Sequence, residues 1–93
     1  MIPIRFKATI RYWDPARSGG LAVVDVPAEQ IPAIGGLRQQ RARGSLGGAE
    51  FASNVMPAGN GRLALSVSKA MLAASGLAIG DQVDVEIKEI GRE

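Results

Sequence analysis

The chain has 93 residues, of which 46% are hydrophobic and 22% are charged, and its formal net charge is +2. This length suits one domain, which we expect over residues 1–93. The sequence has no cysteine and no histidine, which excludes disulfide frameworks, thiolate chemistry, and the commonest general base and transition-metal ligand.

The first two predicted strands precede any helix. Residues 4–12 alternate apolar and polar side chains, the period of two that is typical of a strand with one buried face. Its outward side carries Arg5, Lys7 and Arg11. Residues 13–20 contain proline and paired glycines and predict a loop. Residues 21–26 are apolar at nearly every position, which indicates a second strand that is covered on both faces.

A helical turn and a hairpin follow in the middle of the chain. Pro27 suits a helix start, and residues 28–34 predict a marginal helical turn. Residues 41–46 and 50–56 predict the third and fourth strands, and Gly47-Gly48 between them is typical of a tight hairpin turn. Residues 57–61 predict a loop.

The C-terminal third reads as strand, short helix, turn and strand. Residues 63–67 predict the fifth strand, and Ser68 suits a helix N-cap, with Val67 and Leu72 spaced as a hydrophobic staple. Gly76 predicts the helix end, because glycine adopts the left-handed conformation at little cost. After a turn at Gly80-Asp81, residues 83–88 predict a sixth strand.

Inward parity predicts a core that joins all of these elements. We expect the following side chains to be buried together: Phe6, Ile10, Val26, Phe51, Leu65, Val67, Leu72, Val83, Val85 and Ile87.

The strand–helix–strand pattern occurs twice. Shifting the chain by 41 positions brings residues 21–46 onto residues 62–87 with the same inward parity. A repeat of this kind predicts two halves related by a pseudo-twofold axis, which close a barrel together. It also predicts that Gly35 and Gly76 occupy matching helix ends, and that Val26 and Val67 meet near the axis.

The chain resembles a small bacterial family of domains of unknown function, DUF1905. Five stretches carry the resemblance: Phe6-x-Ala8-x-Ile10, Val24-x-Val26-Pro27, Arg43-Gly44-Ser45-Leu46-Gly47-Gly48-x-x-Phe51, Gly59-x-Gly61-x-Leu63-x-Leu65-x-Val67-x-Lys69 and Gly76-x-x-x-Gly80-Asp81-x-Val83-x-Val85. The resemblance implies a double-split β-barrel, similar to that of AbrB-type DNA-binding regulators. With the elements above, we expect a mainly β fold: a six-stranded double-split barrel with one or two short helices. The family implies no agreed activity.

A set of basic residues is the candidate nucleic-acid surface. Arg5, Lys7 and Arg11 share one outward face, and Arg41 and Arg43 share another. Residues 1–43 carry seven basic and three acidic side chains, whereas residues 44–93 carry four and six. The alternative is cross-strand pairing of these cations with acidic residues such as Asp84 and Glu86, which the low net charge favours.

A second candidate is an anion-binding site. The glycine-rich loop Gly59, Asn60, Gly61 and Arg62, together with the helix start at Ser68 and Lys69, has the residue types that bind anions. It is not a P-loop, since the glycines do not have the required spacing. The alternative is that Lys69 lies in solvent and the glycines only turn the chain.

A catalytic role finds little support in these residues. Ser68 and Lys69 are adjacent, and adjacent helical side chains point about 100° apart. Trp13, the only tryptophan, is either an anchor for a partner or a lid on one end of the barrel.

The sequence therefore favours a non-enzymatic binding or interaction module with an unknown ligand or protein partner, as monomer or homodimer. An AbrB-like nucleic-acid binder is the alternative, and an enzyme ranks third. We expect no cofactor and no metal. No leader-like or membrane-spanning apolar run occurs, so we expect a cytoplasmic protein without a membrane partner.

Overall fold

A computed structural model of the chain describes residues 3–14 and 21–91. The strands are β1 (Ile4–Thr9), β2 (Arg11–Tyr12), β3 (Ala22–Val26), β4 (Gln40–Leu46), β5 (Ala49–Gly59), β6 (Arg62–Val67) and β7 (Gln82–Gly91). The helices are a 3-10 turn η1 (Ala28–Gln30), α1 (Ile31–Ile34) and α2 (Lys69–Ser75). The predicted loop over residues 13–20 falls mostly on residues 15–20, which lie outside the described residues.

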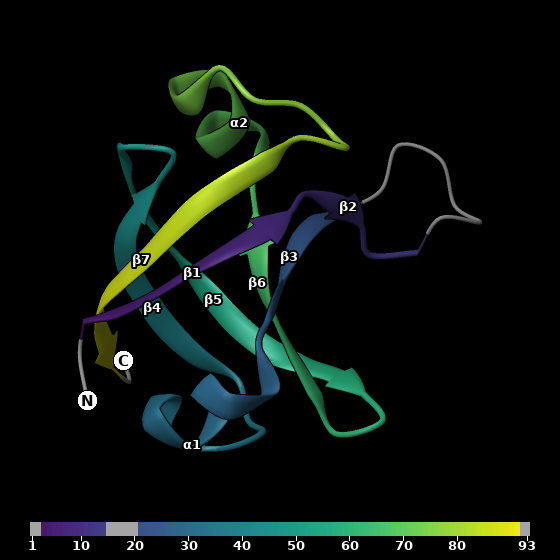
Figure 1. Ribbon diagram of the computed structural model, residues 1–93, viewed down its shortest axis with the longest axis vertical. Helices are drawn as coiled ribbons and strands as arrows, with labels where there is room; N and C mark the ends of the chain where they lie inside the picture. The colour runs from purple at the N-terminus through teal and green to yellow at the C-terminus, as the bar shows by residue number, and fades with distance from the viewer. Residues whose placement is uncertain (1–2, 15–20, 92–93) are drawn as a thin grey trace.

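All seven strands form one antiparallel sheet in the order β1-β7-β4-β5-β6-β3-β2. The sheet curls into a half-barrel, and its two edge strands, β1 and β2, are consecutive in the chain (Figure 1). Helices α1 and α2 lie at opposite ends of this half-barrel (Figure 1). In the described part of the chain, no helix has the length and apolarity needed to cross a membrane.

The predicted six-strand count is not confirmed, because the first predicted strand is broken at Ile10. The backbone N–H of Ile10 donates to the carbonyl of Asp81 at 2.9 Å, and its carbonyl accepts from Gly80 at 2.8 Å. On either side of this point the chain changes partner: β1 pairs with β7, whereas β2 pairs with β3. One predicted strand therefore becomes two short ones.

The core follows the inward parity of the strands closely. Eight of the ten predicted core residues are buried, and the other two, Phe6 and Leu72, are partly buried and pack against the core. The structure adds these buried residues to the core cluster: Ile4, Ala22, Val24, Ile34, Ala42, Leu46, Val55, Leu63 and Met71. Because the described residues share this one cluster, both ends of the sheet are held by the same core.

Helix α2 begins and ends where the sequence predicts. The Ser68 hydroxyl accepts a hydrogen bond from the Met71 N–H at 3.1 Å, as an N-cap does. Gly76 ends the helix with φ 72°, and its N–H donates to the carbonyl of Leu72 at 2.9 Å. Met71, rather than the predicted Leu72, is the buried residue of α2 and packs in the core cluster. Its thioether also lies 3.3 Å from the backbone nitrogen of Ser68.

The other predicted helix and the hairpin are also present. Residues 28–34 form η1 and α1, which end at Gly35 with φ 114°. Gly47 and Gly48 both have positive φ, at 57° and 86°, as a two-residue hairpin loop requires. Strand β5 is longer than predicted, since pairing with β6 continues to Gly59.

The β3–β6 and β4–β7 ladders each contain one pair of residues that lie 41 positions apart. Val24 lies opposite Leu65 in the β3–β6 pair, and Ser45 lies opposite Glu86 in the β4–β7 pair. The predicted meeting of Val26 and Val67 is wrong: Val26 lies opposite Leu63, and Val67 opposite Ala22. In an antiparallel pair, equivalent residues meet only at the middle of the ladder, which here is Val24 and Leu65.

Strands β4 and β7 approach most closely at Gly44. The register of this pair shifts between Arg43 and Gly44. A Cβ atom at Gly44 would lie 1.8 Å from the backbone carbonyl oxygen of Glu86. The bulge therefore depends on the absence of a side chain at this position.

Candidate binding groove

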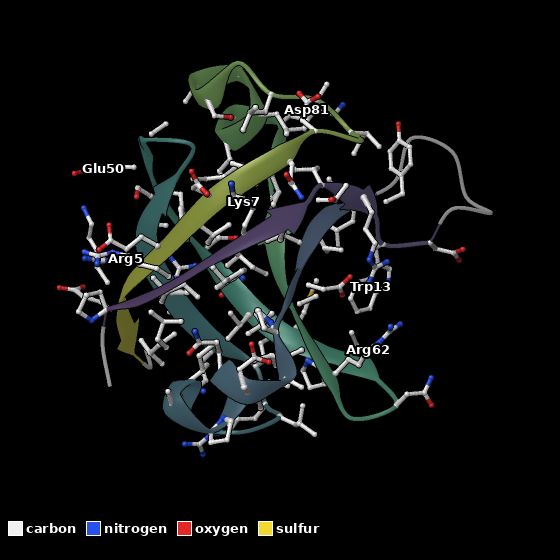
Figure 2. All side chains as sticks on the ribbon, viewed as in Figure 1. Arg5, Lys7, Trp13, Glu50, Arg62 and Asp81 are labelled. Carbon is white, nitrogen blue, oxygen red and sulfur yellow. The ribbon has the colours of Figure 1, made fainter. Side chains whose placement is uncertain are left out.

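The predicted basic face of β1 is paired with β7. Arg5 lies directly opposite Glu86 and Lys7 opposite Asp84 in the strand register. The Arg5 guanidinium lies 3.1 Å from the Glu86 carboxylate, and the Lys7 ammonium lies 3.8 Å from Asp84. Figure 2 shows Arg5 and Lys7 beside β7. The predicted cross-strand pairing of Asp84 and Glu86 with basic residues of the first half is therefore confirmed.

Arg11 forms the tightest ion pair in the described residues. Its Nε and NH2 atoms donate to the two carboxylate oxygens of Asp25 at 2.7 and 2.8 Å. These hydrogen bonds lower the pKa of Asp25 from its ordinary value, with partial burial opposing the shift. Directly opposite Arg11 on β3, Val23 has no exposed surface. The Arg11 side chain on β2 thus joins this strand to β3 through its ion pair with Asp25.

The two basic residues predicted on β4 lie in the same charged surroundings. Arg43 is opposite Glu89 in the register, and their charged groups are 3.8 Å apart. Arg41 lies between Asn54 on β5 and Gly91 on β7. Arg5, Lys7, Arg11 and Arg43 therefore each have an acidic partner, so these surfaces are of mixed charge rather than basic.

The predicted anion-binding residues are not brought together. Gly59, Asn60 and Gly61 form the turn between β5 and β6, and Arg62 begins β6. Ser68 and Lys69 follow the other end of β6, at α2. Six residues of extended chain span about 20 Å. Figure 2 shows Arg62 near this turn, far from α2 (Figure 1). The loop and the helix start do not form one site.

Ser68 and Lys69 instead line an open groove beside α2. This hollow has a volume of about 490 Å³ and is formed by β2, the start of β3, the end of β6, α2 and the turn before β7. We call it the α2 groove, and its lining residues are Tyr12, Leu21, Ala22, Val67, Ser68, Lys69, Leu72 and Ile79. Such a volume is within the range of small-molecule sites.

The α2 groove gathers most of the exposed large apolar side chains. Tyr12, Leu21 and Ile79 are 39%, 42% and 36% exposed, and they come from three separate parts of the chain. The sequence predicts one continuous strand over residues 4–12, with Tyr12 on its inward side, and a strand covered on both faces that begins at Leu21, and it does not single out Ile79, so none of the three was expected at a binding groove. The only sequence signal is that each lies beside a break or turn in the chain.

Trp13 adjoins this region through the backbone. Its N–H donates to the carbonyl of Leu21 at 2.7 Å, and its side chain is 37% exposed. The indole lies on the same side of the molecule as Arg62 (Figure 2). Both predicted roles of Trp13, as a lid on one end of the barrel and as an anchor for a partner, stay predictions.

Two other features bear on the chemistry of the surface. A hollow of about 480 Å³ lies on the charged face, lined by the Arg5–Glu86 and Lys7–Asp84 pairs among others. Within residues 3–14 and 21–91, no three acidic, cysteine or histidine side chains gather as metal ligands would. Ser68 serves as a helix cap, which explains this residue without catalysis.

Comparisons with known proteins assign a family. No curated protein matches the chain. A protein family described as a domain of unknown function, DUF1905, matches residues 6–87, which span β1 to β7 and include the whole α2 groove. The chain therefore belongs to the DUF1905 family.

Proposed function

We propose that this protein is a small, non-enzymatic binding module whose ligand occupies the α2 groove. The observation that carries the proposal is the convergence of Tyr12, Leu21 and Ile79, all exposed, on one hollow. Exposed apolar side chains scattered singly need no explanation, whereas a contiguous group of them marks an interaction site. Binding an apolar group here would remove this surface from water without breaking an ion pair.

We also infer that the half-barrel is the double-split barrel that the sequence predicts, with a pseudo-twofold axis. A shift of 41 positions brings β3 onto residues 63–67 of β6, and β4 onto residues 81–87, most of which lie in β7, and this match of elements supports the inference. So does the sheet order: β5 pairs with β4 and β6, and the consecutive strands β1 and β2 pair with β7 and β3. Gly35 and Gly76, 41 positions apart, both end helices with positive φ.

The repeat allows the residue types at positions 21 and 79 to be compared with those at the equivalent positions of the other half. The offset of 41 brings Leu21 onto Arg62, and Arg38 onto Ile79. Both arginines are exposed. Because the same fold accepts charged side chains at the corresponding places, it does not require apolar ones at positions 21 and 79. A role in binding explains their apolar character.

The neutral fluorescent dye N-phenyl-1-naphthylamine tests this proposal. We expect its emission to rise on binding, and Ile79→Ser or Leu21→Ser to weaken its affinity about tenfold, since about 1.4 kcal/mol of apolar contact is lost. The matched control is Leu37→Ser, because Leu37 is 48% exposed and lies outside the groove, between α1 and β4. Thermal unfolding establishes that each variant is folded.

Two outcomes count against the proposal. One is the absence of dye binding to the folded wild type. The other is an equal loss of affinity in Leu37→Ser and Ile79→Ser, which would mean that the dye samples exposed apolar side chains without preference for the groove.

The alternative nucleic-acid function has weaker support. Arg5, Lys7, Arg11 and Arg43 each have an acidic partner within 4 Å. A phosphate backbone would have to compete with these carboxylates, and like charges would face each other at the contact. The α2 groove, in contrast, contains no acidic side chain.

A further inference from the structure

We propose that the ligand of the α2 groove is a small apolar carboxylate, with its apolar body against Leu21, Leu72 and Ile79 and its carboxylate at Lys69. This inference rests on the proposed function, which concerns only the site. It adds the chemical class of the ligand, and the polar groups of the groove are the observations that support it.

Of residues 3–14 and 21–91, Lys69 is the only charged one that lines the groove. Among the described residues it has no ion-pair partner, whereas Arg5, Lys7, Arg11 and Arg43 all pair with carboxylates. A cation at the rim of an apolar hollow attracts an anionic group, because the low-polarity wall reduces the screening of its charge.

The uncharged polar groups have the matching chemistry. The Ser68 oxygen accepts from the Met71 N–H at 3.1 Å, so its own hydroxyl proton is left to donate. The Tyr12 phenol lines the groove from β2 and is also a donor. Lys69, Ser68 and Tyr12 thus all have side-chain donors, and none of the described residues that line the groove has a carboxylate that would compete as an acceptor. This set complements a carboxylate and repels no part of it.

The size of the groove limits the ligand. About 490 Å³ holds a small molecule with an apolar body of several carbon atoms, as small-molecule sites in proteins do. The three apolar side chains and the single cation favour one orientation of such a molecule in the groove, with its charged end at Lys69. The apolar part supplies affinity, and the charged end supplies selectivity.

Displacement of N-phenyl-1-naphthylamine by matched competitors tests the inference. We use 4-phenylbutyrate, 4-phenyl-1-butanol and 4-phenylbutylamine, which share one apolar body and differ in the charge of their ends. We expect the carboxylate to displace the dye at about tenfold lower concentration than the alcohol, and the amine to be the weakest. Lys69→Met should reduce the preference for carboxylate over alcohol to within about twofold, whereas Lys88→Met should leave it unchanged.

Lys88→Met is a matched control because it removes the same charge from an exposed lysine on β7, away from the groove. Lys69→Gln repeats the test if Lys69→Met does not fold. Equal displacement by carboxylate and alcohol in the wild type overturns the inference while leaving the binding function intact. Failure of all three competitors, with no dye binding, counts instead against the proposed function.

A further binding measurement, with a peptide, distinguishes a small-molecule ligand from the C-terminal tail of a protein. A hexapeptide that ends in two leucines carries the same combination of apolar body and terminal carboxylate. Tighter binding of this peptide than of 4-phenylbutyrate, lost when its C-terminus is amidated, would overturn a small-molecule ligand in favour of a protein tail. We expect the peptide to bind more weakly than 4-phenylbutyrate.

Discussion

The ion pair between Arg11 and Asp25 uses within the fold a basic side chain that was a candidate for nucleic-acid binding. Two nearly parallel hydrogen bonds of 2.7 and 2.8 Å hold the carboxylate, a geometry that positions both partners. A basic residue that the sequence offers for phosphate contact is thereby used within the fold. Alternation along the strand predicted the outward position of Arg11 correctly, but could not predict its partner, because Asp25 belongs to a different strand.

The pair predicts a specific pH dependence of stability. The folded-state pKa of Asp25 is lowered by Arg11, so the pair stabilises the protein fully above the unfolded pKa of about 3.9 and loses this contribution as pH falls through the lower, folded value. Asp25→Asn should reduce stability at pH 7 by up to about 1 kcal/mol. It should also flatten the loss of stability below pH 4, measured by urea unfolding.

The control for this prediction is Asp84→Asn. The Asp84 side chain is 82% exposed and lies 3.8 Å from Lys7, so its removal should change the acid limb little. Parallel acid limbs in the wild type and Asp25→Asn would show that the pair does not contribute to acid sensitivity.

Single residues also mark what the sequence could not reveal about the groove. Exposure of Tyr12 and Ile79 depends on which elements cover them, and a pattern of apolar residues contains no information about that covering. Lys69 was a candidate from the sequence for its position at a helix start. Its place in an apolar groove became visible only when β2 and the turn before β7 were placed beside α2.

At the scale of elements, local signals predicted both ends of α2 but not the full length of β5, the break in the first strand or the strand partners. Ser68 and Gly76 predicted both ends of α2, because capping and the left-handed conformation are local properties. The break at Ile10 was missed, because it depends on hydrogen bonds to Gly80 and Asp81, about 70 residues away.

The β4–β7 ladder has a point of contact that permits no side chain. Gly44→Ala would place a Cβ atom 1.8 Å from the Glu86 carbonyl oxygen and 2.8 Å from the Glu86 carbonyl carbon. Both are backbone atoms, so relief requires β7 to move. We expect a loss of about 1–3 kcal/mol or more in the free energy of unfolding, measured by urea denaturation.

Gly91→Ala is the matched control, since a Cβ at Gly91 meets nothing within 4 Å. Its effect should be within about 0.5 kcal/mol, as at most surface positions. A Gly44→Ala variant with wild-type stability would mean that the two strands can separate at the bulge at little cost.

The whole molecule confirms the mainly β class and shows seven strands among the described residues where the sequence predicted six. Six sequence patterns were found, but the seventh strand arises because the first pattern changes partner halfway. The order of strands could not be predicted from local patterns, since β1 and β7 are neighbours in the sheet and lie at opposite ends of the described chain.

The charge distribution of the whole molecule predicts weak nucleic-acid binding. Three ion pairs with residues 84–89 offset three of the four excess positive charges of residues 1–43. With a fluorescently labelled mixed-sequence duplex, we expect weak affinity and little change between 50 and 200 mM salt, because few counterions are released. Tight binding with a steep salt slope that Arg5→Gln reduces would favour the AbrB-like alternative.

The position of β1 has a consequence for how the chain folds. Its ladder joins Ile4 to Ile87 and Thr9 to Gln82, so its partners lie 73 to 83 positions further along the chain. Contacts between such distant positions make folding slow, because the conformational entropy of the long intervening chain is lost before the contacts between the strands contribute favourable free energy. During synthesis, β7 must therefore leave the ribosome before β1 can pair with it in the sheet.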